Sequence, residues 1–592
     1  GSDSDTRRRM ACEFLKVLVG HFNDKVTPLV TGHVTNLLAQ YAADPINNWK
    51  AKDCAIYLVV ALTVKTSTAR VGAVETNELV PINAFFTEHI QSEIMAPANA
   101  RGSPILKADA LKFITTFRSK FPKETFLGLL PSIIQLLNYE SDGDSPSVVH
   151  SYAALVIERT LIISENRVRR FKAADIAPFI GPLLTALFKA FGLGDNEEND
   201  YLMKCLMRVI AIMGPDIRPF ATECQAEIMK MLVEVSKNPR NPIYNHYLFE
   251  AVGALVSNSP LEEAECANAF EGLLFPPFQT ILQMDVTEFA PYVFQILSQV
   301  LERRPEPLPG AYEQLFTPLL SPILWTRSQN IPSLIRLLQA YLRKAPQTVA
   351  KNMEPILGVF QKLVSSKAHD HQGFFILNSL FESLPYQAIE PFMTGIWGLL
   401  FSRIQAAKTG KLCRSVSVFT SLFAFKHGVS AVNDSAEKVG PGMFKMLLQH
   451  VMLPAMPTLT LGMDKKIVSV GVVKIITEHP AVIADPALTC AILEATVQMF
   501  EKEVRDDGDD DEDDDDVTVG DGTAAAAQLS HAGKVERDPV PEVKDGKHFF
   551  VTSLGQMSAS RPGHFAPIAQ QLTPASQQAL AGYFQAAGVA FP

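Results

Sequence analysis

The stretch that decides the fold is PFIGPLLTALFKAF, residues 178–191, which a short polar turn joins to NDYLMKCLMRVIAIM, residues 199–213. In both segments apolar residues recur at i, i+3, i+4 and i+7, the spacing of one face of a helix. We therefore predict two helices joined by a turn, each with an apolar face that needs a partner.

The same order of elements recurs along the chain. First and second helices of further pairs are predicted at 126–138 and 147–161, 223–238 and 242–256, 273–283 and 287–302, 312–325 and 331–342, 353–366 and 372–385, 392–404 and 411–424, and 443–455 and 464–477. Second helices repeat at about 40–45 residues, stretching to about 50, which is the period of HEAT repeats. Strand-like alternation is scarce. The sequence predicts an all-α fold, a HEAT-repeat α-solenoid in which antiparallel helix pairs stack into a right-handed superhelix.

The expected domain organisation is a solenoid over residues 1–504, an acidic loop over 505–522 and terminal capping repeats over 523–592. The opening helix has no partner before it, so we expect the chain to be a fragment that begins inside a repeat. The acidic loop contains DDGDDDEDDDD, residues 506–516, whose ten acids equal the whole net charge of −10. Such a run is expected to be disordered, and it either stays solvated or attracts a basic partner.

Composition argues against several classes of function. Without the acidic run the chain is close to neutral, and it shows no basic stripe of the kind that nucleic-acid binding requires. No stretch of about 18 uncharged apolar residues is present, so membrane insertion is not expected. None of the seven cysteines has CxxC spacing, which argues against a zinc module and favours a reducing compartment.

Catalytic and cofactor motifs are also missing from the sequence. It contains no GxxxxGK[ST], GxGxxG, HExxH or GxSxG pattern, so we expect neither an enzyme nor a bound cofactor. His369 and His371 are the closest histidine pair, but residues i and i+2 of a helix point to different sides. The alternative is structural: Asp370 lies in a turn and is suited to capping the helix that follows.

Several long stretches resemble a known family. They are GSDSDTRRRMACEFL, NWKAKDCAIYLVVALT, SPILKADALKFITTFRSKFPKE, KNPRNPIYNHYLFEA, DVTEFAPYVFQIL, LWTRSQNIPSLIRLLQAYL, GVFQKLVSSKAHDHQGFFILNSL and HAGKVERDPV. These segments resemble the C-terminal part of the exportin-2 family, the importin-α re-exporters of the importin-β (karyopherin) superfamily. The likeness covers nearly the whole chain.

That resemblance implies a nuclear export receptor that returns importin-α to the cytoplasm as a complex with Ran-GTP. It also implies nucleoporin Phe-Gly repeats as partners, shuttling between nucleus and cytoplasm, a monomeric state, and partner binding on the inner face lined by second helices. The family's N-terminal repeats, which make the principal Ran contacts, are absent from this chain. The alternative from the residues alone is a HEAT-repeat scaffold subunit of another assembly.

Candidate contact residues lie in turns and at the starts of second helices, where polar groups are expected on the concave side. They are Arg7, Arg8 and Arg9; Arg240, Asn241, Tyr244, Asn245 and His246; Arg327, Gln329 and Asn330; Asp370 and Gln372; and Asp509, Asp510, Asp511 and Glu512 of the acidic run. Positive charge is unfavourable at the N-terminus of a helix, so the three arginines also predict an acidic neighbour or partner.

Overall fold

The computed structural model describes residues 6–96, 102–141, 143, 145–504, 528–533 and 537–590. It divides into two compact units. Unit 1 comprises Gly1–Val300 with Leu529–Gly533, and unit 2 comprises Leu301–Gln528 with Lys534–Pro592. Each unit is a stack of antiparallel helix pairs, so the all-α HEAT-repeat fold is confirmed. Unit 1 thus includes five residues that the sequence assigned to the terminal repeats.

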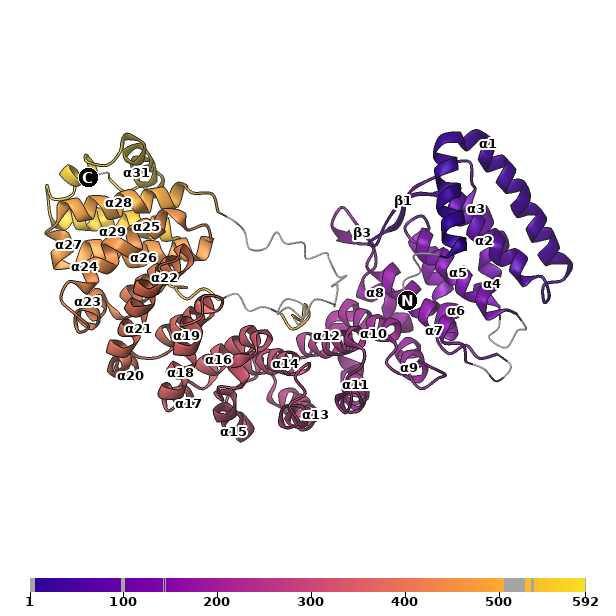
Figure 1. Ribbon diagram of the computed structural model, residues 1–592, viewed down its shortest axis with the longest axis horizontal. Helices are drawn as coiled ribbons and strands as arrows, with labels where there is room; N and C mark the ends of the chain where they lie inside the picture. The colour runs from indigo at the N-terminus through magenta and orange to yellow at the C-terminus, as the bar shows by residue number, and fades with distance from the viewer. Residues whose placement is uncertain are drawn as a thin grey trace. The chain divides into compact units, whose positions relative to one another are not determined.

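Unit 1 contains the helices α1–α13 and most of α14, with two short hairpins (Figure 1). The elements are α1 (Arg7–Ala43), α2 (Trp49–Thr63), β1 (Val64–Thr68), β2 (Gly72–Thr76), α3 (Ile82–Phe85), η2 (Phe86–Ile90), α4 (Gln91–Met95), α5 (Pro104–Phe117), α6 (Lys123–Leu136), α7 (Ser147–Leu161), β3 (Ser164–Glu165), β4 (Val168–Arg169), α8 (Ala173–Ile176), η3 (Ala177–Phe179), α9 (Ile180–Ala190), α10 (Asp200–Met213), η4 (Gly214–Phe220), α11 (Ala221–Ser236), α12 (Pro242–Asn258), α13 (Ala264–Gln283) and α14 (Ala290–Arg303).

Unit 2 continues the same alternation from the end of α14 to the C-terminus. The elements are α15 (Gly310–Leu319), η5 (Leu324–Thr326), η6 (Ser328–Asn330), α16 (Ile331–Lys344), α17 (Pro346–Ala350), α18 (Met353–Val364), α19 (Asp370–Ser383), α20 (Tyr386–Ile389), η7 (Glu390–Phe392), α21 (Met393–Ala406), α22 (Gly410–His427), α23 (Val429–Glu437), α24 (Met443–Leu447), η8 (Leu448–Met452), α25 (Leu453–Ala455), η9 (Met456–Thr458), α26 (Gly462–Glu478), α27 (Pro480–Ile483), α28 (Pro486–Glu501), α29 (Gly546–Ser560), α30 (Ala566–Ala569) and α31 (Pro574–Ala587).

One row of helices in each unit is built from the second members of the pairs, which we call the B helices. They are α2, α5, α7, α10, α12 and α14 in unit 1, and α16, α19, α22, α26 and α29 in unit 2. Successive B helices lie side by side, as α10 and α12 do in unit 1 and α22 and α26 do in unit 2 (Figure 1). Most of their side chains are buried, so the B helices form much of the core of each unit.

The predicted pairs and the observed helices agree closely in most of the chain. The decisive stretch forms α9 and α10, with Asn199 capping α10 through hydrogen bonds to the amides of Tyr201 and Leu202 at 3.1 and 3.2 Å. At the N-terminus, the predicted opening helix is the start of one long element, α1, which bends at Phe22 (φ −135°, ψ 40°).

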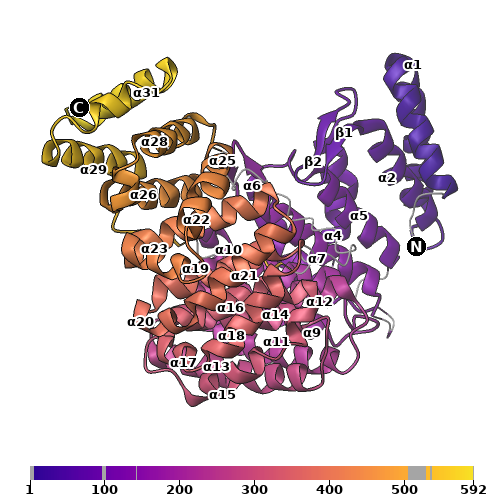
Figure 2. The same ribbon diagram turned by 60° about the vertical axis from the view of Figure 1, so that its left-hand side comes forward.

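The two β-hairpins were not predicted. Each directly follows a B helix: β1–β2 comes after α2 (Figure 2), and β3–β4 comes after α7 (Figure 1). The turn of β3–β4 has positive φ at Asn166 and Arg167, 51° and 63°, as a two-residue type I′ hairpin requires. The hairpins are therefore insertions after two B helices of unit 1, α2 and α7.

One segment of the described chain, Ala173–Ala190, is long and apolar enough by composition to cross a membrane, with a mean hydropathy of 1.3. It contains Asp175 and Lys189, and the 3-10 turn η3 separates α8 from α9 within it. In the structure α9 packs against α6 and α10 as the first helix of a repeat, which accounts for its apolar character.

Candidate protein-interaction surface

Polar side chains link neighbouring B helices at intervals close to the repeat length. Arg208 of α10 donates to Glu158 of α7 at 3.3 Å, and both side chains are 2% exposed. In unit 2, Gln339 of α16 donates to the hydroxyl of Ser379 of α19 at 3.0 Å. Because buried charges are costly unless paired, these links fix the polar residues of the B helices in place. A surface built on this row is thus preorganised.

The arginine triplet lies at the start of α1, where Thr6 caps the helix by accepting from the amide of Arg9 at 3.2 Å. Arg8 donates to both oxygens of Asp53 of α2, at 3.3 and 2.7 Å. Its guanidinium carbon lies 4.4 Å from the ring centroid of Tyr57. Asp53 is therefore the acidic neighbour that the sequence predicted. All three arginines are exposed, but Arg8 is engaged by Asp53, so Arg7 and Arg9 are the residues of the triplet most open to a partner.

A second carboxylate lies behind this ion pair. Asp109 of α5 is 6% exposed and hydrogen-bonds to Asp53, while its Oδ2 has no hydrogen-bond partner within the described residues. Burial, and next the neighbouring Asp53, raise the pKa of Asp109 to about 8. The folded chain therefore holds Asp109 protonated at neutral pH.

This raised pKa predicts a pH-dependent stability that the substitution Asp109→Asn removes. The unfolded chain has the ordinary aspartate pKa of about 3.9, so the folded state binds the extra proton between about pH 4 and pH 8. Stability contributed by this site therefore falls as the pH rises through that window. Because asparagine keeps a donor toward Asp53 without a charge, we expect Asp109→Asn to stabilise the chain by about 2 kcal/mol at pH 8.5 and by less at pH 5.5.

Urea unfolding at the two pH values measures this effect. The exposed Asp24→Asn is the matched control and is expected to leave the pH dependence unchanged. An Asp109→Asn chain with the same pH dependence as the unsubstituted chain would show that Asp109 is ionised in the folded state.

In the NPRNPIYNHY turn, only some of the residues that were predicted to contact a partner are accessible. Asn241 caps α12 by accepting from the amides of Ile243 and Tyr244, both at 3.2 Å, and it donates to the carbonyl of Glu198 at 3.0 Å. Arg240 is exposed and lies 3.4 Å from Glu198. Of this group, Arg240 is the residue that a partner can reach.

Three other residues of that turn are corrected. Tyr244, Asn245 and His246 are 3%, 4% and 1% exposed, because the first turn of α12 is enclosed by neighbouring helices. The ring of Tyr244 packs edge-on against Phe191, with 6.3 Å between the ring centroids. Their polar groups serve the packing of the repeat rather than a partner contact.

In the TRSQN turn, too, one predicted contact residue is buried and the others are partly accessible. Asn330 is fully buried, and its amide donates to the carbonyl of Leu324 at 3.2 Å, so its predicted role as a contact residue is wrong. Arg327 and Gln329 are half-buried. They stay candidates for a partner contact.

The His369-Asp370-His371 triplet requires the clearest correction. Helix α19 begins at Asp370 itself, and His369 occupies the capping position without a side-chain hydrogen bond to the helix. Asp370 is 2% exposed and pairs with Arg403 of α21, whose Nη2 lies 3.3 Å from its Oδ2. Asp370 is thus half of a buried ion pair, not an exposed cap. Gln372 is half-buried and contacts the ring of His371 at 3.2 Å.

The hairpins carry exposed charged side chains that the sequence analysis did not predict, including the acids Glu75 and Glu165. Arg70 of the β1–β2 turn donates to the hydroxyl of Ser164 at 3.0 and 2.5 Å, which joins the two hairpins. Arg118 of the helical layer donates to the carbonyl of Ala69 at 2.5 Å. The exposed cations of this surface are Lys65, Arg167, Arg169 and Lys172. The available signals were the β-branched residues at every second position of VKTST and the Asn-Arg turn in SENRVR.

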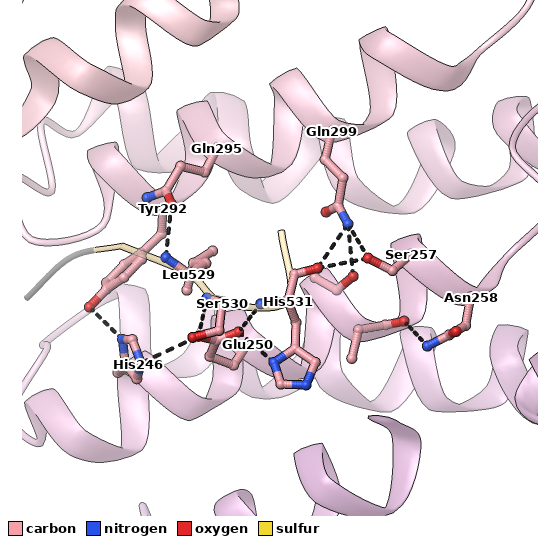
Figure 3. Close-up of polar contacts among 12 residues, drawn as sticks. His246, Glu250, Ser257, Asn258, Tyr292, Gln295, Gln299, Leu529, Ser530 and His531 are labelled. Carbon is pink, nitrogen blue, oxygen red and sulfur yellow. Dashed lines mark hydrogen bonds and ion pairs between the residues drawn. The ribbon is translucent and has the colours of Figure 1, made fainter. Parts of the chain in front are cut away.

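A second missed feature is the packing of Leu529–Gly533, which we call the clasp segment, on α12 and α14 of unit 1 (Figure 3). The buried Glu250 of α12 accepts hydrogen bonds from the amides of Ser530 and His531 at 2.6 and 2.8 Å, and from Nδ1 of His531 at 3.0 Å. Burial by itself would raise the pKa of Glu250, but the hydrogen bonds from His531 outweigh it and hold the pKa below its usual value.

Four predicted contact residues fall outside the described part of the chain. Asp509, Asp510, Asp511 and Glu512 of the acidic run belong to residues 505–527. Their role in attracting a basic partner stays a prediction.

Two family models match the sequence along nearly its full length. Residues 1–157 match Cse1, and residues 158–583 match the C-terminus of CAS/CSE proteins. Among curated relatives, exportin-2 of Oreochromis niloticus is 40% identical over 600 residues and exportin-2 of Homo sapiens is 39% identical over 601 residues. Both alignments cover 100% of this chain and 61% of the relative, so the chain spans about three fifths of the length of these proteins.

Solved structures show the same relationship. The exportin Cse1 in its cargo-free, cytoplasmic state superposes with a TM-score of 0.84 at 27% identity, covering 99% of this chain and 60% of the other. The bidirectional nuclear transport receptor Lph2 of S. cerevisiae superposes with a TM-score of 0.59 at 14% identity, covering 97% of this chain and 60% of the other. The second similarity shows the fold alone.

Proposed function

The chain belongs to the CAS/CSE family of exportins, and from that premise we propose that it is part of a nuclear export receptor that carries importin-α to the cytoplasm in a complex with Ran-GTP. The observation that carries the proposal is the family match over the whole chain. The receptor would shuttle between the nucleus and the cytoplasm. The role assigned to the solenoid is binding, not catalysis.

The B-helix row supports the proposal physically. Stacked repeats rotate slightly against their neighbours, and small rotations along a solenoid add up to a change of curvature. If Ran-GTP and importin-α favour the same curvature, each raises the affinity for the other by the same factor. The ion pairs between B helices, such as Arg208–Glu158, would keep each repeat intact while the curvature changes.

A groove on the first-helix side of unit 2 supports Phe-Gly motifs as further partners. It has a volume of about 410 Å³ and is lined by Phe444, Leu448, Pro480, Ala481, Val482 and Leu488, with the polar side chains of Asn433, Glu437, Lys445 and His479 also in its wall. The ring of Phe444 stacks on His479 with 4.9 Å between centroids. Such a pocket suits a phenylalanine side chain, which buries a large apolar area against aromatic partners.

The test is the dependence of importin-α binding on the nucleotide bound to Ran. Full-length protein that contains this chain is expected to retain importin-α with Ran-GTP and to lose most of it with Ran-GDP, a difference of at least tenfold in the retained amount. The chain by itself, assayed beside it, shows how much of the binding the rest of the protein contributes. Importin-α binding that is equal with Ran-GTP, Ran-GDP and no Ran would overturn the proposal and favour a HEAT-repeat scaffold.

A further inference from the structure

The clasp segment is bound in unit 1 as an extended peptide is bound in a groove (Figure 3). Besides the three hydrogen bonds to Glu250, Oε1 of Gln295 accepts from the amide of Leu529 at 2.9 Å. The carbonyl of His531 accepts from Oγ of Ser257 at 2.7 Å and from Nε2 of Gln299 at 3.1 Å. Side chains of the B helices α12 and α14 therefore hydrogen-bond three consecutive backbone amides, those of residues 529–531, and one carbonyl, that of His531.

The floor of the groove is a glycine that the clasp needs. A Cβ added to Gly253 of α12 would lie 3.1 Å from the amide nitrogen of Ala532 and 3.2 Å from the carbonyl carbon of His531. The backbone of the clasp thus lies so close to the helix that a side chain at position 253 would push it outward by a few tenths of an ångström. Leu529 and Ala532 are 3% and 1% exposed, and they supply the apolar part of the contact.

The groove itself is held by residues outside the clasp. Behind Glu250, Nε2 of His246 lies 3.6 Å from Oε1, and Nδ1 of His246 lies 3.2 Å from the hydroxyl of Tyr292. Burial lowers the pKa of His246, so its ring is neutral and can position the carboxylate without neutralising it. His246 and Tyr292 lie outside the clasp, so they continue to hold the orientation of the Glu250 side chain when the clasp leaves.

We propose that this groove is a binding site for an extended peptide that presents consecutive amides and an imidazole, and that the clasp is its reversible intramolecular occupant. A partner segment of the same chemistry would displace it. The contacts are chiefly hydrogen bonds, which water or another backbone can replace, and the segment is only five residues long. The inference goes beyond the proposed function and does not rest on it, because neither Ran nor importin-α enters its test.

Hydrogen exchange on the intact chain tests whether the clasp opens. The amides of the clasp are expected to exchange at least 100-fold faster than the buried amides of α12, because they open without unfolding of the helix. Glu250→Gln and Gly253→Val are both expected to accelerate clasp exchange further. Glu265→Gln, which removes an exposed carboxylate of α13, is the control and leaves the rate unchanged. Clasp amides that exchange only together with α12 would overturn the proposal.

A peptide added in trans tests whether the groove is a site. In the full chain, residues 529–533 are replaced by glycine and serine, and a fluorescent peptide of residues 528–533, QLSHAG, is titrated while its anisotropy is measured. Saturable binding is expected, at least tenfold tighter to this variant than to the unsubstituted chain. It is expected to weaken at least tenfold with Glu250→Gln in the chain or with alanine at the peptide's histidine, and to be unaffected by Glu265→Gln.

The peptide titration also has a result that would overturn the proposal of a binding groove. The clasp-replaced chain must first give the circular dichroism spectrum and melting profile of a folded helical protein. If that folded chain fails to bind the peptide, or binds it equally with and without Glu250→Gln, the groove is a fixed structural contact and not a binding site.

Discussion

Replacing Gly471 by alanine is expected to destabilise unit 2 by about 3 kcal/mol, at the upper end of what overpacking usually costs. Gly471 lies at the point where the B helices α22 and α26 approach each other. An added Cβ would lie 2.2 Å from the carbonyl oxygen of Ser421 and 2.4 Å from its Cα. These are backbone atoms of a buried helix, so no side chain can turn away to relieve the contact.

The same substitution elsewhere in unit 2 provides the control. At Gly398 of α21, a Cβ would meet no atom of a neighbouring element of the described chain within 4 Å, and alanine is a better helix former than glycine by about 1 kcal/mol. Gly398→Ala is therefore expected to leave unit 2 unchanged or slightly more stable. Urea unfolding followed by circular dichroism measures both variants. Equal midpoints for the two variants would show that α22 and α26 do not pack as closely as described.

Replacing Arg403 by methionine is expected to cost about 3–5 kcal/mol, because it leaves Asp370 as an unpaired buried charge. The guanidinium of Arg403 also donates to the carbonyls of Val364 and Ala407 at 3.0 and 2.9 Å. The two side chains are 7% and 2% exposed, so water cannot take the place of the lost partner.

Two further variants test whether the loss of stability comes from the unpaired charge of Asp370 rather than from the changed shape of the side chain at position 403. Asp370→Asn combined with Arg403→Met removes the uncompensated charge, and the pair is expected to be more stable than Arg403→Met alone. Arg240→Met breaks an ion pair whose arginine is 65% exposed, and it is expected to cost less than about 1 kcal/mol. If Arg403→Met costs no more than Arg240→Met in urea unfolding, the Asp370–Arg403 pair contributes no more than a surface pair.

The arginine triplet and the His-Asp-His triplet show which local contacts can be predicted from the sequence and which cannot. The unfavourable charge of Arg8 at a helix start predicted an acidic neighbour, and Asp53 is that neighbour. Asp370 was predicted to cap a helix, because aspartate before an apolar run is a common cap. Its real partner lies 33 residues away in the next repeat, and nothing in the local sequence distinguishes a cap from half of an ion pair.

The recognition residues were harder to predict than the repeats. Polar residues in turns and at helix starts were expected to face a partner, yet Tyr244, His246 and Asn330 are enclosed by packing. The reason is that local sequence gives the direction of a side chain only relative to its own helix. Whether a neighbouring helix covers that direction depends on how the repeats stack.

By itself the sequence determined the class of fold and the order of its elements. The 3.6-residue periodicity fixes which residues form a helix and which face is apolar, and the repeat length fixes that the helices stack in pairs. These properties follow from local chemistry, so α9 and α10 could be placed from their residues alone.

Only the tertiary structure decided which polar groups meet. The clasp reaches Glu250 across a sequence separation of 280 residues or more, and Gly471 matters only because Ser421 lies beside it. Contacts of this kind depend on the rotation between successive repeats, which is set by the sum of many side-chain packings. The apolar pattern within one helix therefore does not predict that rotation.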